Sequence, residues 1–210
     1  MMVFHSVPIV VQKLFPKRIW EVDTTEKKVF LTFDDGPVPT VTDFVLNELE
    51  KRSQKASFFM VGDNVRKHSA LAHEVMSAGH QIGNHTYNHL NGFKTRDDLY
   101  FENFQKSEHE FEEKLGIQTH LFRPPYGLLR SGQAKRILET HQIVMWNVLG
   151  GDYVPNLSSA KIISEITRLT KEGAIILFHD QQKTKEVLPK FLPYFLDFLA
   201  DQGYSTAILE

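Results

Sequence analysis

Short apolar runs alternate with longer amphipathic stretches along nearly the whole chain, and this pattern predicts its secondary structure. Runs rich in β-branched and aromatic residues predict seven strands, at 29–33, 56–61, 81–83, 121–122, 143–148, 174–178 and 205–209. Between them, apolar residues recur at helical spacing and predict helices near 41–49, 69–78, 101–115, 131–140, 158–170 and 188–199. Gly116 is placed to end the longest of these helices.

Strands that alternate with helices at this spacing predict a parallel sheet with helices outside it. The sheet could be open and doubly wound, or closed into a barrel, but no glycine-rich dinucleotide fingerprint follows any strand. In a barrel, residues at the carboxyl ends of the strands meet on one face. The suggestive polar residues of this chain occupy such ends: Asp34, Asp35, His85, Arg123, Asp152 and His179.

Length and composition indicate one globular domain. The 210 residues suffice for a single well-buried core, and neither a repeat nor a linker is visible. A net charge of −2, with no basic block, gives no reason to expect nucleic acid as a partner, and we expect a monomer. No run approaches the length of a membrane span. The location is unknown; since no signal peptide is visible, the cytoplasm is weakly favoured.

The chain has no cysteine, so any bound metal must be held by His, Asp, Glu or water. Asp34 and Asp35 follow the first predicted strand, and Gly36-Pro37 ends that strand sharply. Two adjacent carboxylates repel each other unless they share a proton or one of them binds a metal. The alternative is a turn that only caps the strand.

His85 and His89 follow the third predicted strand. Placed on one helical turn, positions i and i+4 lie on the same face, so both imidazoles can reach one ion. Two histidines and one carboxylate from Asp34 or Asp35 leave open positions for water and substrate, as a catalytic site requires. The alternative is two surface histidines.

Arg123-Pro124-Pro125-Tyr126-Gly127 predicts a stiff corner. Two prolines fix the backbone there and Gly127 frees it, so an amide can be held in position for a developing oxyanion. Arg123 can fix a neighbouring carboxylate, although an ordinary surface loop is the alternative.

His179 ends the most apolar strand and is placed to act as a general acid if a carboxylate raises its pKa. Asp152, at the exit of the previous strand, is the expected partner. A structural histidine is the alternative. Trp146 and Tyr153 could line a groove, but packing in the core is the safer expectation. The other seven histidines are expected on the surface or in packing roles.

Taken together, these motifs resemble the NodB-homology polysaccharide deacetylases, carbohydrate esterase family 4. Four elements occur in that family's order: TFDDGP at 32–37, GNHTYNH at 83–89, RPPYG at 123–127 and LFHD at 177–180. The resemblance implies a distorted (β/α)7 barrel, similar to a TIM barrel, over residues 28–210, after a lead-in at 1–27.

The resemblance also implies roles. Asp34 is the general base, and Asp35, His85 and His89 hold a divalent metal, usually Zn²⁺, with Co²⁺, Ni²⁺ or Mn²⁺ as alternatives. The Tyr126 N–H holds the oxyanion and His179 protonates the leaving amine, while Arg123 holds Asp34 and Asp152 orients His179. The implied reaction removes N-acetyl groups from a GlcNAc-containing glycan such as peptidoglycan or a chitin-type oligosaccharide.

One motif departs from the family. An acid-rich segment that commonly closes on Asp-Trp is replaced here by residues 146–153, which end in Asp152-Tyr153 and lack the earlier acids. The tuning of His179 is therefore open. Relatives of this fold deformylate a lipid-linked amino sugar or cleave O-acetyl esters on xylan, and a non-catalytic glycan-binding module is a third alternative.

Overall fold

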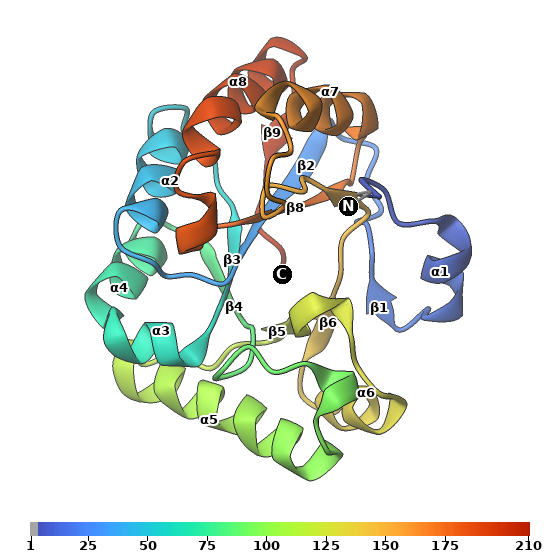
Figure 1. Cartoon of the computed structure of the whole chain (residues 1–210), viewed down its shortest axis with the longest axis vertical. Coiled ribbons are helices and arrows are strands. Elements are labelled where there is room, and N and C mark those ends of the chain that lie inside the picture. Colours follow the sequence, from blue (N-terminus) through green and yellow to red (C-terminus); the bar gives the residue numbers. More distant parts are fainter. Residues whose placement is uncertain (1–3) are drawn as a thin grey trace.

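In the computed structural model, which describes residues 4–210, the chain forms a curled parallel sheet with helices around its outer face (Figure 1). All pairs between named strands are parallel, in the order β1-β6-β5-β4-β3-β2-β8-β7, with β9 added to β2. The strand bounds are β1 Arg18–Ile19, β2 Lys28–Asp34, β3 Ser57–Met60, β4 Gln81–Asn84, β5 Leu121–Phe122, β6 Gln142–Val144, β7 Val148–Leu149, β8 Ile175–His179 and β9 Ser205–Thr206.

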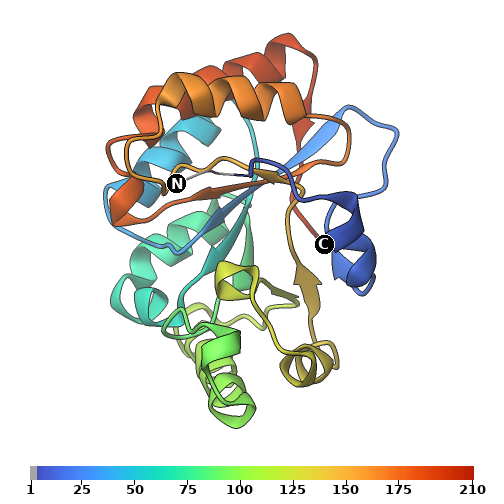
Figure 2. The same ribbon diagram turned by 45° about the vertical axis from the view of Figure 1, so that its right-hand side comes forward.

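Helices cover the outer face of this sheet in one row. Neighbouring helices pack in the order α7-α8-α2-α4-α5-α6, and α3 packs against α4 and α5. Figure 2 shows α7 and α8 lying together on one side of the sheet. The bounds are α1 Ile9–Leu14, α2 Val41–Glu50, α3 Gly62–Lys67, α4 Ser69–Ser77, α5 Asp97–Leu115, α6 Ser131–Ile137, α7 Ser159–Leu169 and α8 Leu188–Asp201. The predicted α/β barrel in a single domain is confirmed.

The alternation of side chains along the central strands separates an inner from an outer core. On β2, Val29, Leu31 and Phe33 face outward and join the core under the helices. Phe30 faces inward with Phe59, Leu121, Val144, Ile175 and Leu209. Because the period of a strand is two residues, Asp34 lies on the same inward side as Phe30. The strand thus delivers this carboxylate to one end of the barrel interior.

The strand expected at 143–148 is wrong as one element. The structure has two short strands there: β6 lies between β1 and β5, and β7 lies beside β8 at the other end of the sheet order. At the break, the Asn147 side chain accepts the Ile175 N–H (2.9 Å), while its own backbone N–H donates to the Ile175 carbonyl. Three residues of one segment, 145–147, therefore connect β6 on one side of the curled sheet to β7 on the other.

The other differences lie at the ends of the chain and beside β3. Only Ser205–Thr206 of the last predicted strand pairs with β2, because residues 207–209 turn inward and Leu209 fills the barrel interior. The sequence pattern did not predict α1, β1 or α3. β1 pairs with β6, and residues 6 and 21 form bridges to 148 and 174, so the expected lead-in contacts the barrel. Residues 1–3 of that lead-in lie outside the described residues, and a domain boundary at 28 stays a prediction.

We expect Phe195→Ala to lower the free energy of unfolding by about 3–5 kcal/mol, because a large buried ring is replaced by a cavity. Phe195 is completely buried and packs against Phe178 on β8. Chemical denaturation measures the change. Its neighbour Tyr194 is 63% exposed, so Tyr194→Ala should change the free energy by less than about 0.5 kcal/mol. Equal effects of the two changes would contradict this packing.

Candidate active site

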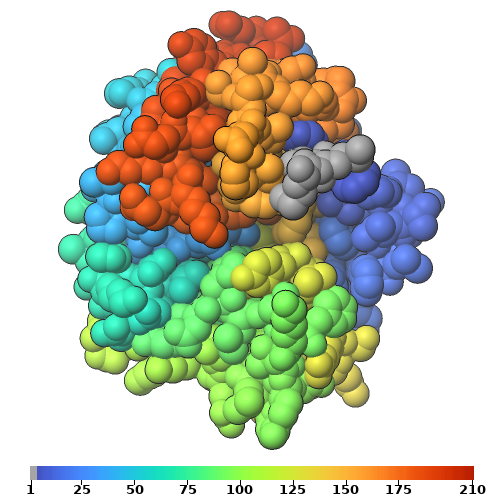
Figure 3. Space-filling view, viewed as in Figure 1, coloured from blue at the N-terminus to red at the C-terminus, as the bar shows by residue number. Residues whose placement is uncertain are grey.

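A cavity of about 560 Å³ opens at the carboxyl ends of the strands and is lined by 18 residues from several loops. Figure 3 shows the face on which these loops converge, with the orange segments on one side of the hollow and the green and yellow segments on the other. Six of the eight residues predicted for the site line the cavity: Asp34, Asp35, His85, His89, Tyr126 and His179. Arg123 and Asp152 lie behind this lining and contact it.

Asp34 is the last residue of β2 and is held by a completely buried arginine. Nη1 of Arg123 donates to Asp34 Oδ1 (2.8 Å) and to the Thr32 hydroxyl (2.7 Å). Burial lowers the pKa of Arg123, and the charge and hydrogen bond of Asp34 oppose this effect. The other oxygen of Asp34 lies 3.8 Å from His85 Nε2.

Asp35 leaves the strand with a φ of 81°, which turns its side chain towards the same cavity. Its Oδ1 lies 3.4 Å from His85 Nε2 and 3.1 Å from His89 Nε2. Burial alone would raise the pKa of Asp35, but the two imidazoles hold it well below its usual range. The turn at Asp35 explains how two consecutive carboxylates share one cavity.

The two histidines reach Asp35 from a loop and not from a helical turn. The expected helical turn was therefore wrong, although both imidazoles do meet the carboxylate as expected. Residues 85–90 have no helical structure, and positive φ angles at Thr86 (64°) and His89 (56°) bend the chain. The Thr86 N–H donates to the Asn84 side chain (2.7 Å), and its hydroxyl accepts the Leu90 N–H (3.1 Å). These bonds hold the loop that carries both rings.

The ring nitrogens are arranged as a metal site requires. His85 Nδ1 lies 2.7 Å from the Arg123 carbonyl, which can only accept, so Nδ1 carries the proton and Nε2 is free as a ligand. One donor atom each from Asp35, His85 and His89 lies within 4.8 Å of the others. Asp35 Oδ1 is buried without a hydrogen-bond partner among residues 4–210. These three residues therefore fit a divalent cation.

His179 faces Asp34 across the sheet, since the two are register partners in the β2–β8 pair. Asp152 accepts from both the His179 backbone N–H (2.7 Å) and His179 Nδ1 (3.0 Å). Burial alone would lower the pKa of His179, but the charge and hydrogen bond of Asp152, with the charges of Asp35 and Asp34, raise it to about 9. Although residues 146–153 lack the earlier acids of the family motif, Asp152 still supplies the carboxylate that His179 needs.

The Arg-Pro-Pro corner places Tyr126 beside His89. Tyr126 has a φ of 61°, and its ring packs edge to face against that of His89 at 4.7 Å. No oxygen of residues 4–210 accepts the Tyr126 N–H, whereas the N–H of Gly127 donates to Pro124. Tyr126 therefore offers a spare backbone donor at the cavity wall.

Several residues of the site were missed or assigned differently from sequence. Trp146 and Tyr153 line the cavity rather than only filling core, and the Tyr153 ring packs 4.9 Å from that of His179. Asp180 is completely buried and accepts from the Gly36 N–H (3.1 Å) and the Thr42 hydroxyl (2.6 Å), which ties the loop after β2 to the end of β8. Its position directly after His179 was the available signal. None of the other seven histidines lines the cavity.

With this geometry, the site is that of a metal-assisted hydrolase at the carboxyl end of a parallel barrel. Residues 21–146 match the family model described as polysaccharide deacetylase. The chain belongs to the polysaccharide deacetylase family. It is therefore a deacetylase of acetylated glycans, and members of this family use a divalent metal.

Individual relatives agree. The chain is 36% identical over 192 residues to a peptidoglycan-N-acetylglucosamine deacetylase of Bacillus cereus, and this alignment covers 88% of this chain and 87% of the relative. It is 30% identical to peptidoglycan-N-acetylglucosamine deacetylase PgdA of Listeria monocytogenes, with 89% of this chain but only 39% of that protein covered. The crystal structure of the Bc1960 peptidoglycan N-acetylglucosamine deacetylase superposes with a TM-score of 0.83 at 29% identity, covering 92% of this chain and 91% of the other.

Three further expectations concern a membrane span, the oligomeric state and the location. None of the helices within residues 4–210 has the length and apolar character that a bilayer crossing needs. The monomeric state and the cytoplasmic location stay predictions.

We expect Asp152→Asn to lower the pKa of His179 from about 9 towards its ordinary value near 6.5, because the variant loses the charge that opposes burial. An NMR titration of the metal-free protein measures it. Since a raised histidine pKa stabilises the fold below pH 6.5 and this contribution is lost as pH rises through 9, the unfolding free energy should fall less over that range in the variant.

Asp63→Asn is the matched control, because Asp63 lines the same cavity but is bound to Arg66 and Lys67. The pKa of His179 should stay near 9 in this variant. A pKa near 9 in both variants would contradict the assignment of Asp152 as the cause.

Proposed function

We propose that this protein removes the N-acetyl group from N-acetylglucosamine residues of peptidoglycan, with Zn²⁺ held by Asp35, His85 and His89. The observation that carries the proposal is the convergence of this donor set with Asp34 and His179 in one open cavity. The names of the relatives support peptidoglycan as the substrate. Two histidines and one carboxylate suit zinc but also accept other first-row ions.

When bound, the ion would supply a Lewis acid that polarises the amide carbonyl and lowers the pKa of a water molecule. The protein supplies the proton transfers. Asp34 is the proposed general base, because it lies within reach of the metal donor set without joining it. Arg123 fixes this carboxylate through a 2.8 Å hydrogen bond, so that it is positioned to accept the proton of the attacking water.

As water adds to the carbonyl carbon, negative charge develops on the carbonyl oxygen. The N–H of Tyr126 is the protein's proposed donor to this oxygen. Because the hydrogen bond from the Gly127 N–H to the Pro124 carbonyl closes the turn around Tyr126, this donor is held in place before the reaction.

Collapse of the tetrahedral adduct breaks the C–N bond and requires a proton on the amine nitrogen. His179 is the proposed donor, since its raised pKa keeps it protonated at neutral pH. Asp152 occupies Nδ1 and leaves Nε2 to face the cavity. The products are acetate and a free amino sugar.

We expect Asp34→Asn to lower kcat by roughly 10²–10⁴-fold while the protein keeps its metal, because the amide cannot accept the proton and the donor set is untouched. Acetate release measures the first effect, and atomic absorption after dialysis the second. Asp35→Asn is the matched variant and should lose the metal as well. If Asp34→Asn loses the metal and Asp35→Asn keeps it, the two roles are exchanged.

The substrate is tested by incubating the metal-loaded protein with peptidoglycan fragments, chitin oligomers and acetylated xylan, with and without a chelator. We expect acetate from the first two glycans, most rapidly from peptidoglycan fragments, and no turnover once the metal is removed. Faster cleavage of xylan esters would contradict the proposed amide substrate. Binding without hydrolysis of any glycan would leave only the binding-module alternative.

A further inference from the structure

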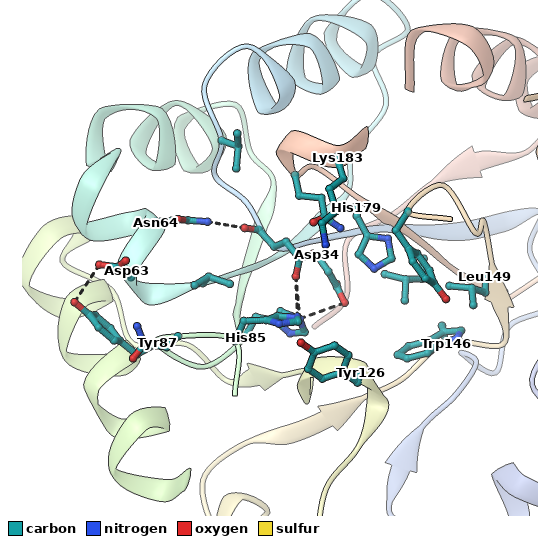
Figure 4. A pocket seen from close by; sticks show the side chains of 18 residues that line it. Asp34, Asp63, Asn64, His85, Tyr87, Tyr126, Trp146, Leu149, His179 and Lys183 are labelled. Carbon is teal, nitrogen blue, oxygen red and sulfur yellow. Dashed lines mark hydrogen bonds and ion pairs between the residues drawn. The ribbon is translucent and has the colours of Figure 1, made fainter. Parts of the chain in front are cut away.

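One lysine side chain, that of Lys183, lies at one end of the cavity. Of the lining residues, all within the described part of the chain, Lys183 is the only lysine or arginine. It also lines an adjoining groove whose other walls come from residues 152–159, Glu186, Val187 and Lys190. Figure 4 shows its side chain reaching over the cavity beside His179. Lys183 therefore lies where a glycan bound at His179 would continue into the groove.

The position of Lys183 is fixed by the residues around it. It belongs to the short 3₁₀ turn Gln182–Thr184, and the buried Thr184 hydroxyl lies 2.6 Å from the His179 carbonyl and 2.8 Å from that of Gln181. Asp180 anchors the start of the same segment to Gly36 and Thr42. The backbone that carries the Lys183 side chain is thus held directly to His179.

No acidic side chain of residues 4–210 forms an ion pair with Lys183, which is exposed. At the opposite end of the cavity the charged group is already paired, because the carboxylate of Asp63 is bound to Arg66, Lys67 and the Tyr87 hydroxyl. An unpaired ammonium group at a cleft wall favours a substrate with negative charge at that point. A neutral polymer of N-acetylglucosamine carries no such charge.

We propose that Lys183 binds a carboxylate on the substrate next to the sugar that is deacetylated, and so selects acidic glycans over neutral ones. In peptidoglycan this carboxylate is either the free lactyl group of muramic acid or an acid of the attached peptide. The proposal rests on the proposed function, since it assumes that a glycan occupies the cavity.

The test compares three tetrasaccharides with the metal-loaded full chain: chitotetraose, a peptide-free alternating glycan with free lactyl carboxylates, and the same glycan carrying its peptides. Values of kcat and KM are measured for the wild type, Lys183→Met and Lys185→Met. Lys185 is the matched control because it is exposed on the same segment but lines neither cavity.

We expect Lys183→Met to lower the ratio of kcat/KM for the charged glycan to that for chitotetraose by roughly three- to tenfold, mainly through KM, as for one partly exposed charge-assisted contact. High salt should lower the wild-type ratio in the same direction. Loss with the peptide-free glycan identifies the lactyl group, and loss only with the peptide-bearing glycan identifies the peptide. Lys185→Met should leave the ratio in place.

An unchanged ratio in Lys183→Met would overturn the proposal, and so would an equal loss with charged and neutral glycans. If the ratio changes equally in both lysine variants, general surface charge is the cause and the assignment to Lys183 is wrong. A wild type that hydrolyses chitotetraose but shows no preference overturns this inference alone. A wild type that hydrolyses none of the three overturns the proposed function and this inference with it.

Discussion

The guanidinium of Arg123, completely buried inside the barrel, is the interaction on which the rest of the site depends. It donates to Thr32 and Asp34 on β2 and to the carbonyls of Val144 and Met145, where β6 ends. Meanwhile its own carbonyl fixes the tautomer of His85. A buried charge is tolerated only when it is paired and hydrogen-bonded, and here each bond also positions a part of the site. A lysine has one ammonium group and could not span these partners.

A second constraint is the period of the strands. Asp34 and His179 face each other because they are register partners on neighbouring parallel strands, and both lie on the inward side. Phe33 and Phe178, one residue earlier, face the helices and pack against each other. Shifting either strand by one residue would exchange the charged and aromatic faces. The outer aromatic core therefore also secures the distance between the proposed base and the proposed acid.

Much of this arrangement could be predicted because it depends on local pattern. The apolar runs located the central strands, and the positions of Asp34, Asp35, His85 and His179 at strand ends placed them together. What failed depended on contacts that are distant in sequence. Nothing local distinguishes 143–148 from one strand, because its break follows from pairing with β8. The loop at His85 required left-handed backbone angles at Thr86 and His89, and the β-branched Thr86 gives no sign of such a conformation. Asp180 became part of the site only through Gly36 and Thr42.

The break between β6 and β7 has a consequence for how the barrel is held closed. In a barrel laced by main-chain bonds all the way round, strand number and stagger fix the circumference. Here the segment after Trp146 is held to β8 twice at one residue, because the Asn147 backbone N–H donates to the Ile175 carbonyl and the Asn147 side-chain oxygen accepts the Ile175 N–H. The Asn147 side-chain oxygen thereby takes the place that a backbone carbonyl would take in a regular ladder, and it holds the residue next to Trp146, on the cavity wall, in register with β8.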